Sequence, residues 1–133
     1  MFRKKRPPQR PLDFHEAPDV KDRIHDLLRI MDLPHIKKEH IFVVRSDHSR
    51  ARIYARIWGL SRIFQEAAGL PALYAIEVVS KYYDLLSEEK KYQVLLHELM
   101  HIPTTFSGAL LPHTKTFHTR YHTQWQIFME TFF

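Results

Sequence analysis

Residues 87–103 read Ser-Glu-Glu-Lys-Lys-Tyr-Gln-Val-Leu-Leu-His-Glu-Leu-Met-His-Ile-Pro, and this stretch decides the fold. Ser87 can cap a helix, and the two carboxylates after it complement the positive end of the helix dipole. Pro103 disfavours helical geometry at Ile102. Apolar residues occupy most sides of the segment between them, as they do in a helix that is buried rather than superficial. The stretch therefore predicts a central, buried helix over residues 87–102.

Inside this predicted helix, His97-Glu98-Leu99-Met100-His101 forms an H-E-x-x-H pattern. Residues four apart lie on one face of a helix, so His97 and His101 can bind a single Zn²⁺ together. Glu98 stands next to the first ligand, where it can take a proton from a water that the metal activates. The pattern predicts a zinc hydrolase site in which Glu98 is the general base.

A catalytic zinc site needs a third protein ligand and one open position. No Asp or Glu lies between Glu98 and Glu130, so most of the available donors after the helix are histidines. The candidates are His113, His118, His122 and Glu130. The chain between Pro103 and His113 is long enough to turn back toward the helix, but the spacing alone leaves all four candidates open.

The remaining hydrophobic patterns predict helices near both ends of the chain and three strands between them. The helices are expected at residues 19–31, capped by Asp19, and at residues 117–132; the strands are expected at residues 41–45, 52–58 and 74–79. Residues 60–68 fit either a helical turn or a loop, and residues 103–116 have no regular pattern. The expected fold class is α+β, with one compact domain over residues 19–133 and a small mixed or antiparallel sheet packed on the central helix.

Several side chains in these elements have two interpretations. Glu77 lies within an apolar strand, where it could orient a ligand histidine or simply face solvent. Arg52 and Arg56 share one side of the strand at residues 52–58, and this side could line a substrate groove or stay solvated. Tyr121 could stabilise an oxyanion from the terminal helix, although nothing in the spacing selects it over other tyrosines.

The basic character of the chain belongs mainly to its beginning. Residues 1–11 contain five of the 20 Lys and Arg residues and no acid, so the other 122 residues carry 15 charges of each sign. A neutral body argues against a dedicated nucleic-acid-binding domain, whereas residues 3–10 could contact phosphates weakly and without sequence specificity. We expect residues 1–18 to be a flexible, proline-rich leader.

The composition also excludes some classes of protein. The chain has no cysteine, which excludes disulfides and thiolate metal sites and suits a reducing compartment. No apolar run approaches the roughly 18 residues that a membrane span needs. The basic amino terminus leads into prolines rather than an apolar core, which is not the pattern of a secretory signal. We therefore expect a cytoplasmic protein without a membrane partner.

Several further segments resemble the predicted metallopeptidases of archaea, which are related to the phage metallopeptidase group. The resemblance covers about residues 40–115 and is carried by residues 50–60 (RARIYARIWGL), 74–78 (YAIEV), 95–103 (LLHELMHIP), 105–110 (TFSGAL) and 112–113 (PH). It implies a compact zincin domain with one Zn²⁺ per chain. It also implies that His97, His101 and His113 are the metal ligands and that Glu98 is the general base.

These observations predict zinc-dependent hydrolysis of peptide bonds in a peptide or protein substrate. The alternative is a zincin-fold protein without catalysis, such as a zinc-binding or DNA-associated regulatory module. Glu98 argues against this alternative, because a purely structural zinc site has no use for a general base beside its ligands. A zinc hydrolase that acts on a non-peptide amide fits the same residues.

Overall fold

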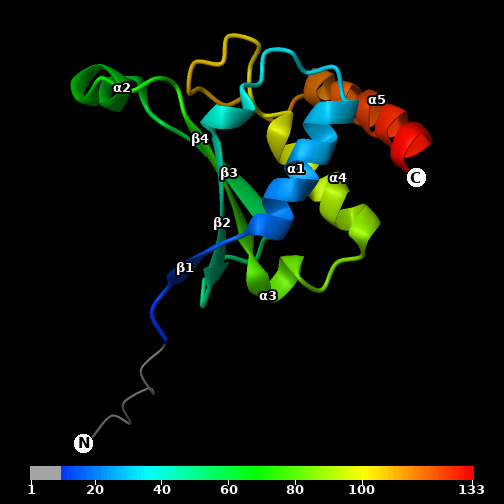
Figure 1. The fold of residues 1–133 in the computed structure, drawn as a ribbon, viewed down its shortest axis with the longest axis horizontal. Helices are drawn as coiled ribbons and strands as arrows, with labels where there is room; N and C mark the ends of the chain where they lie inside the picture. Colours follow the sequence, from blue (N-terminus) through cyan, green and yellow to red (C-terminus); the bar gives the residue numbers. More distant parts are fainter. Residues whose placement is uncertain (1–9) are drawn as a thin grey trace, which may run out of the picture.

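A four-stranded sheet in the order β1-β2-β4-β3 supports the helices of this protein, and the computed structural model describes residues 10–133 (Figure 1). The elements in chain order are β1 (Asp13–Glu16), α1 (Pro18–Ile30), a 3-10 turn η1 (Lys38–His40), β2 (Ile41–Asp47), β3 (Ala55–Gly59), α2 (Arg62–Ala68), β4 (Tyr74–Val79), α3 (Ser80–Tyr83), α4 (Glu88–Leu99) and α5 (Lys115–Phe132). β2 runs parallel to β4, whereas β1 and β3 are antiparallel to their neighbours. The sheet is therefore mixed, and the α+β class is confirmed.

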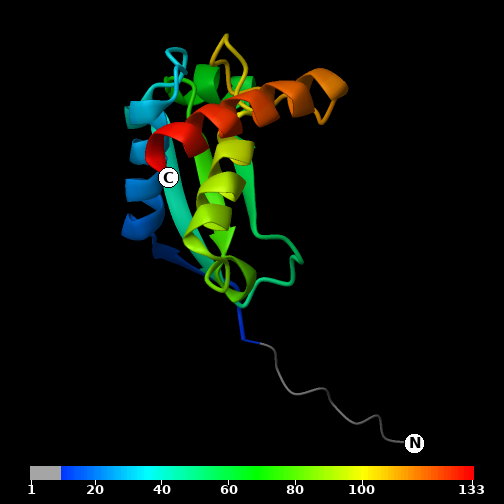
Figure 2. The same ribbon diagram turned by 90° about the vertical axis from the view of Figure 1, so that its right-hand side faces the viewer.

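The helices α1 and α4 cover one face of the sheet, and α5 packs across both of them (Figure 2). Alternate residues of the central strand β4, Tyr74, Ile76 and Val78, face these helices and are almost completely buried. They pack in one hydrophobic core with Leu95 and Leu99 of α4. Burial on this scale explains why the central helix is apolar on most of its sides.

The helix α4 begins as its sequence predicts. Ser87 is the N-cap, and its Oγ accepts a hydrogen bond from the backbone N–H of Lys90 at 3.3 Å. The helix ends at Leu99, three residues earlier than expected, because the hydrogen bonds after it change from the α-helical to the 3-10 pattern. The backbone N–H groups of His101 and Ile102 donate to carbonyls three residues back, at 3.1 Å each. This tighter turn leads directly into Pro103.

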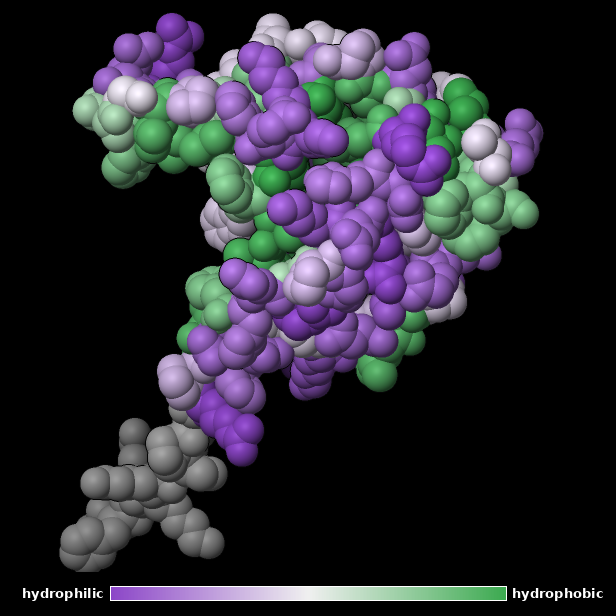
Figure 3. Space-filling view, viewed as in Figure 1, coloured by the Kyte–Doolittle hydropathy of each residue, from purple (hydrophilic) through white to green (hydrophobic). Residues whose placement is uncertain are grey.

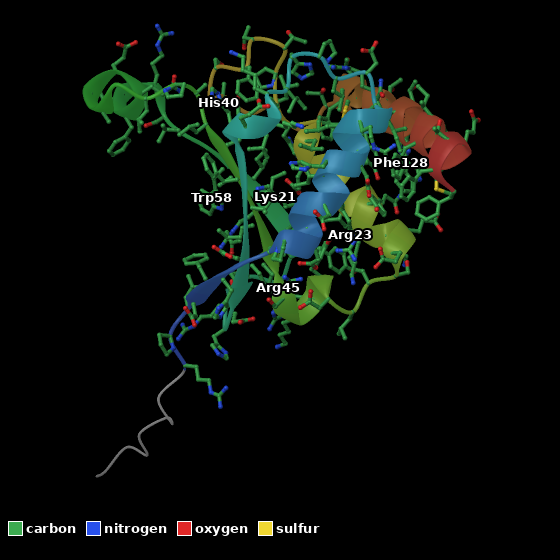
Figure 4. The ribbon with its side chains drawn as sticks, viewed as in Figure 1. Lys21, Arg23, His40, Arg45, Trp58 and Phe128 are labelled. Carbon is green, nitrogen blue, oxygen red and sulfur yellow. The ribbon has the colours of Figure 1, made fainter. Side chains whose placement is uncertain are left out.

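The other face of the sheet carries no helix within residues 10–133. Trp58 is 53% exposed there and points away from α1 (Figure 4). Glu77 lies on the same face but is only 2% exposed, since it accepts hydrogen bonds from Arg56 Nε at 2.7 Å and Trp58 Nε1 at 3.1 Å. Burial alone would raise the pKa of Glu77, but these bonds and one with Ser46 lower it below its usual value. Both sequence interpretations of Glu77 are therefore wrong: it neither faces solvent nor orients a ligand histidine.

The amino-terminal region differs from the expected leader. Residues 13–16 of the expected leader form β1, and its last residue, Pro18, begins α1. Residues 1–9, and with them most of the predicted phosphate-contacting segment 3–10, lie outside the described residues. The cap predicted at Asp19 is also wrong, because α1 begins one residue earlier, at Pro18. The Asp19 carboxylate instead accepts two hydrogen bonds from Arg45, both at 2.9 Å.

Several other boundaries also differ from the sequence prediction. β3 begins at Ala55 rather than at residue 52, and residues 62–68 form α2 on an arm between β3 and β4 (Figure 1). The arm projects from the body, and Figure 3 shows hydrophobic side chains on it; Ile63 and Phe64 are its most exposed apolar residues.

Among residues 10–133, no helix combines the length and hydrophobicity that crossing a membrane would require.

Candidate metal centre

Three histidines from two segments meet beside α4. His97 and His101 lie on α4 and on the turn that follows it, and His113 lies in the loop before α5. One ring nitrogen from each lies within 4.8 Å of the others. His97 Nε2 and His113 Nε2 are 3.0 Å apart, and the rings of His101 and His113 have centroids 4.6 Å apart. The three imidazoles therefore converge on one point.

The ring of His101 is held by the loop that also carries His113. Its Nδ1 lies 2.6 Å from the carbonyl oxygen of Leu111, and the backbone N–H of Leu111 donates to the carbonyl of His101 at 2.7 Å. A carbonyl oxygen only accepts, so Nδ1 carries the proton and the lone pair is on Nε2. This tautomer leaves Nε2 free to bind a metal, and the paired bonds position the chain two residues before His113.

The loop at residues 103–114 is attached to the sheet by Tyr74 of β4. The Tyr74 hydroxyl accepts a hydrogen bond from the backbone N–H of Gly108 and donates one to the carbonyl of Ala109, both at 2.8 Å. Gln65 of α2 adds a second attachment, since its Nε2 donates to the carbonyls of Leu60 and Ser107 at 2.8 and 2.9 Å. The irregular loop thus has a defined path without any regular secondary structure.

Two glycines allow this attachment. A Cβ on Gly59 would lie 1.9 Å from the carbonyl oxygen of Gly108, which no side chain can occupy. Gly108 has a φ of 92°, a conformation that L side chains rarely adopt, and a Cβ there would lie 2.3 Å from the carbonyl oxygen of Leu60. The end of β3 and the histidine-bearing loop can therefore approach only because both positions are glycine.

Aromatic residues of α5 close the buried side of the cluster. Thr114 caps α5 by accepting a hydrogen bond from the Phe117 N–H at 3.1 Å, which places Phe117 one turn into the helix. The Phe117 ring stacks on His101 with centroids 4.5 Å apart. Burial, together with the neighbouring histidines, lowers the pKa of His97 to about 4, and burial also lowers the pKa of His101. Both rings are therefore neutral at pH 7, which is the form that binds a metal.

Glu98 lies beside this cluster and is 9% exposed. Burial raises the pKa of its carboxyl to about 7. Its side chain, His97 and Tyr121 line a hollow of about 740 Å³, and residues 52–55 also line it. The arrangement combines three ring nitrogens that could hold a metal with a carboxyl group that can exchange a proton near neutral pH.

Comparison with known proteins gives the family. The model of the family described as "Putative phage metallopeptidase" matches residues 12–132. The chain belongs to this family. The match extends beyond residues 40–115 and includes all of β1 and α5. No curated protein and no solved structure matches the chain significantly.

Membership of a metallopeptidase family indicates a hydrolase that acts on peptide bonds with the help of a metal. The three histidines of this family member are a group that could hold that ion. The archaeal branch of the expected resemblance stays a prediction.

The structure also places the other sequence candidates. His118 stacks on His113 with ring centroids 6.0 Å apart but does not join the metal-binding group, and within residues 10–133 neither do His122 and Glu130. Tyr121 lines the hollow, where its hydroxyl donates a long hydrogen bond of 3.4 Å to the carbonyl of Gln93.

The two arginines that the sequence placed on one side of a strand are separated. Arg52 precedes β3 and lines the hollow beside Glu98, whereas Arg56 binds Glu77 on the opposite face of the sheet. Sequence reasoning missed the residues that hold the loop, chiefly Tyr74 and Gly59. The scarcity of glycine was an available signal, because the chain has only three and two of them meet here.

Proposed function

We propose that this member of the phage metallopeptidase family is a zinc-dependent peptidase in which Glu98 is the general base. One observation carries the proposal: three histidines converge on a point at the edge of a hollow that also contains a buried carboxyl group. A structural metal site would need the histidines but not the carboxyl group.

The donor set fits Zn²⁺. His97, His101 and His113 offer three imidazole nitrogens, and such ligands suit zinc rather than magnesium or calcium, which prefer oxygen. Three protein ligands leave the fourth position of a tetrahedral ion open, as in catalytic sites. When bound, Zn²⁺ supplies Lewis-acid chemistry that polarises a carbonyl and lowers the pKa of water toward 7.

The protein groups around the ion have separate tasks. Glu98 takes the proton from the water that attacks the scissile carbonyl and then gives a proton to the leaving amine. The carbonyl of Leu111 keeps the His101 ring in the tautomer that binds metal. Phe117 packs against the cluster, where its ring stacks on His101 and helps to hold that ring in place.

The sheet offers a place for an extended substrate. β3 is an edge strand, since it pairs only with β4 in the order β1-β2-β4-β3. Residues 52–55, which lead into this strand, border the hollow that contains Glu98. A peptide that adds to the free edge of β3 would therefore run past the metal centre, with its main chain held by hydrogen bonds to the strand.

The proposal is tested with protein reconstituted with zinc. We expect about one Zn²⁺ per chain and cleavage of casein that a chelator abolishes and added zinc restores. Glu98→Gln should keep the zinc and lose cleavage by at least about a hundredfold, since it keeps the size of the side chain but cannot act as a base. Protein that binds no zinc, or a Glu98→Gln variant that cleaves as fast as the parent, would contradict the proposal.

A further inference from the structure

The hollow that contains Glu98 adjoins a second one of about 860 Å³, and Arg52 and Tyr82 line both. The loop that joins β2 to β3 forms much of the wall of this second hollow. Figure 2 shows this loop projecting beside the lower part of the sheet, near α3. A chain that leaves the metal centre past Arg52 and Tyr82 would enter the second hollow.

This second hollow, here called the basic hollow, is lined by four exposed cations: Arg10, Arg50, Arg52 and Lys81. Among residues 10–133, none of the four forms an ion pair with a carboxylate, and residues 1–9 contain no acid. The one acid in the lining is Asp47, whose carboxylate lies 2.9 Å from His15 Nε2. The hollow therefore carries four cations against a single carboxylate and has an excess of positive charge.

This charge is a local feature rather than a property of the whole body. Residues 12–133 carry 15 cations and 15 acids. Two arginines elsewhere are paired at short distances: Arg23 with Glu88 at 2.6 Å and Arg45 with Asp84 at 2.7 Å. Unpaired cations gathered in a concave surface focus the electrostatic field and attract anionic groups.

We propose that the basic hollow is a subsite for acidic side chains of the peptide substrate, on one side of the bond that is cleaved. The inference rests on the proposed peptidase function, because it assigns the substrate class of the same cleft. A substrate that follows the edge of β3 toward the beginning of this strand reaches Arg52 first and then Arg50. Asp or Glu residues there would meet the cations, while the bond to be cleaved lies beside Glu98.

The neighbouring hollow favours a peptide over a nucleic acid as the ligand. It is lined by apolar groups from Ile53, Leu86 and Val94 in addition to Glu98. Such a surface suits apolar peptide side chains beside the scissile bond, whereas a charged phosphate backbone would gain nothing from contact with it. The expected substrate segment is therefore mixed, with apolar residues at the scissile bond and acidic residues a few positions away.

Binding is measured first, without cleavage, in zinc-loaded Glu98→Gln protein. The probes are two fluorescein-labelled decapeptides with the same apolar centre, one flanked by four Glu and the other by four Gln. Since several exposed ion pairs act together, we expect the Glu peptide to bind roughly tenfold more tightly at low salt. Adding Arg50→Gln and Arg52→Gln should remove most of this difference, whereas the control pair Arg29→Gln and Arg62→Gln should leave it unchanged.

Cleavage by the parent protein then locates the subsite. Quenched fluorescent peptides carry a single Glu, or Gln as its control, at each of five positions on either side of the cleaved bond. We expect a higher kcat/KM for Glu on one side only, a preference that Arg50→Gln with Arg52→Gln abolishes. The side that responds gives the direction in which the substrate lies along β3.

The outcomes separate this inference from the proposed function. Equal binding and cleavage of the Glu and Gln peptides would overturn the inference and leave the peptidase standing. Binding of the Glu peptide that depends on Arg50 and Arg52, in a protein that cleaves no peptide, would support acidic recognition while the proposed activity fails. If a single-stranded decathymidylate binds through Arg50 and Arg52 and the Glu peptide does not, the inference is wrong and the hollow binds nucleic acid.

Discussion

The Tyr74 hydroxyl lies 2.8 Å from the backbone nitrogen of Gly108, so the central strand of the sheet directly holds the loop that carries His113. The same hydroxyl donates to the carbonyl of Ala109. The position of the third histidine therefore depends on a contact between β4 and a segment 34 residues later in the chain. This dependence links the packing of the sheet to metal binding.

Tyr74→Phe should weaken both the fold and the metal centre. It keeps the buried ring but leaves the Gly108 N–H without its partner, a loss of about 1–2 kcal/mol in the free energy of unfolding. We also expect weaker zinc binding in a chelator competition, because the loop becomes less well held. The control is Tyr92→Phe, which removes a 2.7 Å bond to Asp26 away from the histidines. It should reduce stability by a similar amount and leave zinc affinity unchanged.

Gly59→Ala tests the close approach of β3 and the loop. The new Cβ would clash with the Gly108 carbonyl oxygen, so the backbone must move. The control is Gly69→Ala, where φ is 65° but no atom lies within 4 Å of the new Cβ. Strain at Gly69 alone should cost about 1–2 kcal/mol in urea unfolding. We expect Gly59→Ala to cost more and, unlike Gly69→Ala, to weaken zinc binding; equal effects of the two would show that the clash is relieved without moving His113.

The sequence could predict the two histidines on and just after α4 because the patterns that indicate them lie within one short segment. The cap at Ser87, the apolar pattern of α4 and the four-residue spacing of His97 and His101 all lie within one helix, where spacing in sequence fixes position in space. The loop at residues 103–114 has no such periodicity. Its path is set by Tyr74 and Gln65, which come from distant elements, so the spacing of the residues could not choose among the four candidate ligands.

The errors elsewhere have a similar origin. β1 has four residues and follows a basic, proline-rich segment, so its pairing with β2 had no strong pattern to reveal it. Glu77 alternates as a solvent-facing residue would, yet Arg56 and Trp58 cover it on a sheet face that no described helix packs against. The pattern of apolar and polar residues along a strand does not show when polar side chains of a neighbouring strand cover a residue on the same face.

Glu77→Gln should change how stability depends on pH. The folded pKa of Glu77 lies below its value in the unfolded chain, so its charge stabilises the fold above the unfolded pKa, about 4.3. This contribution is lost as the pH falls through the lower folded pKa. We expect Glu77→Gln to cost about 1.5–3 kcal/mol near pH 7, the value of hydrogen bonds to a charged group, and less near pH 3.

Urea unfolding at both pH values measures this effect. The control is Glu66→Gln, which removes the exposed partner of Arg62 at 3.7 Å and should change little at either pH. A Glu77→Gln variant that loses the same stability at both pH values would contradict the assigned role of the charge.

The assignment of the third zinc ligand is tested by comparing His113→Ala with His118→Ala. The two rings stack 6.0 Å apart, but only His113 has a nitrogen within reach of the nitrogens of His97 and His101. Loss of a group that only supports a ligand costs about 10–100-fold in metal affinity, so loss of a ligand should cost more than about a hundredfold. We expect His113→Ala to exceed that limit and His118→Ala to stay below about tenfold in one chelator-competition protocol. His122→Ala and Glu130→Ala, at exposed positions on α5, should bind zinc like the parent. If His113→Ala retained the parent's affinity while His118→Ala lost it, α5 would have to supply the third ligand, and the zinc-bound loop would adopt a different path from the one that Tyr74 holds here.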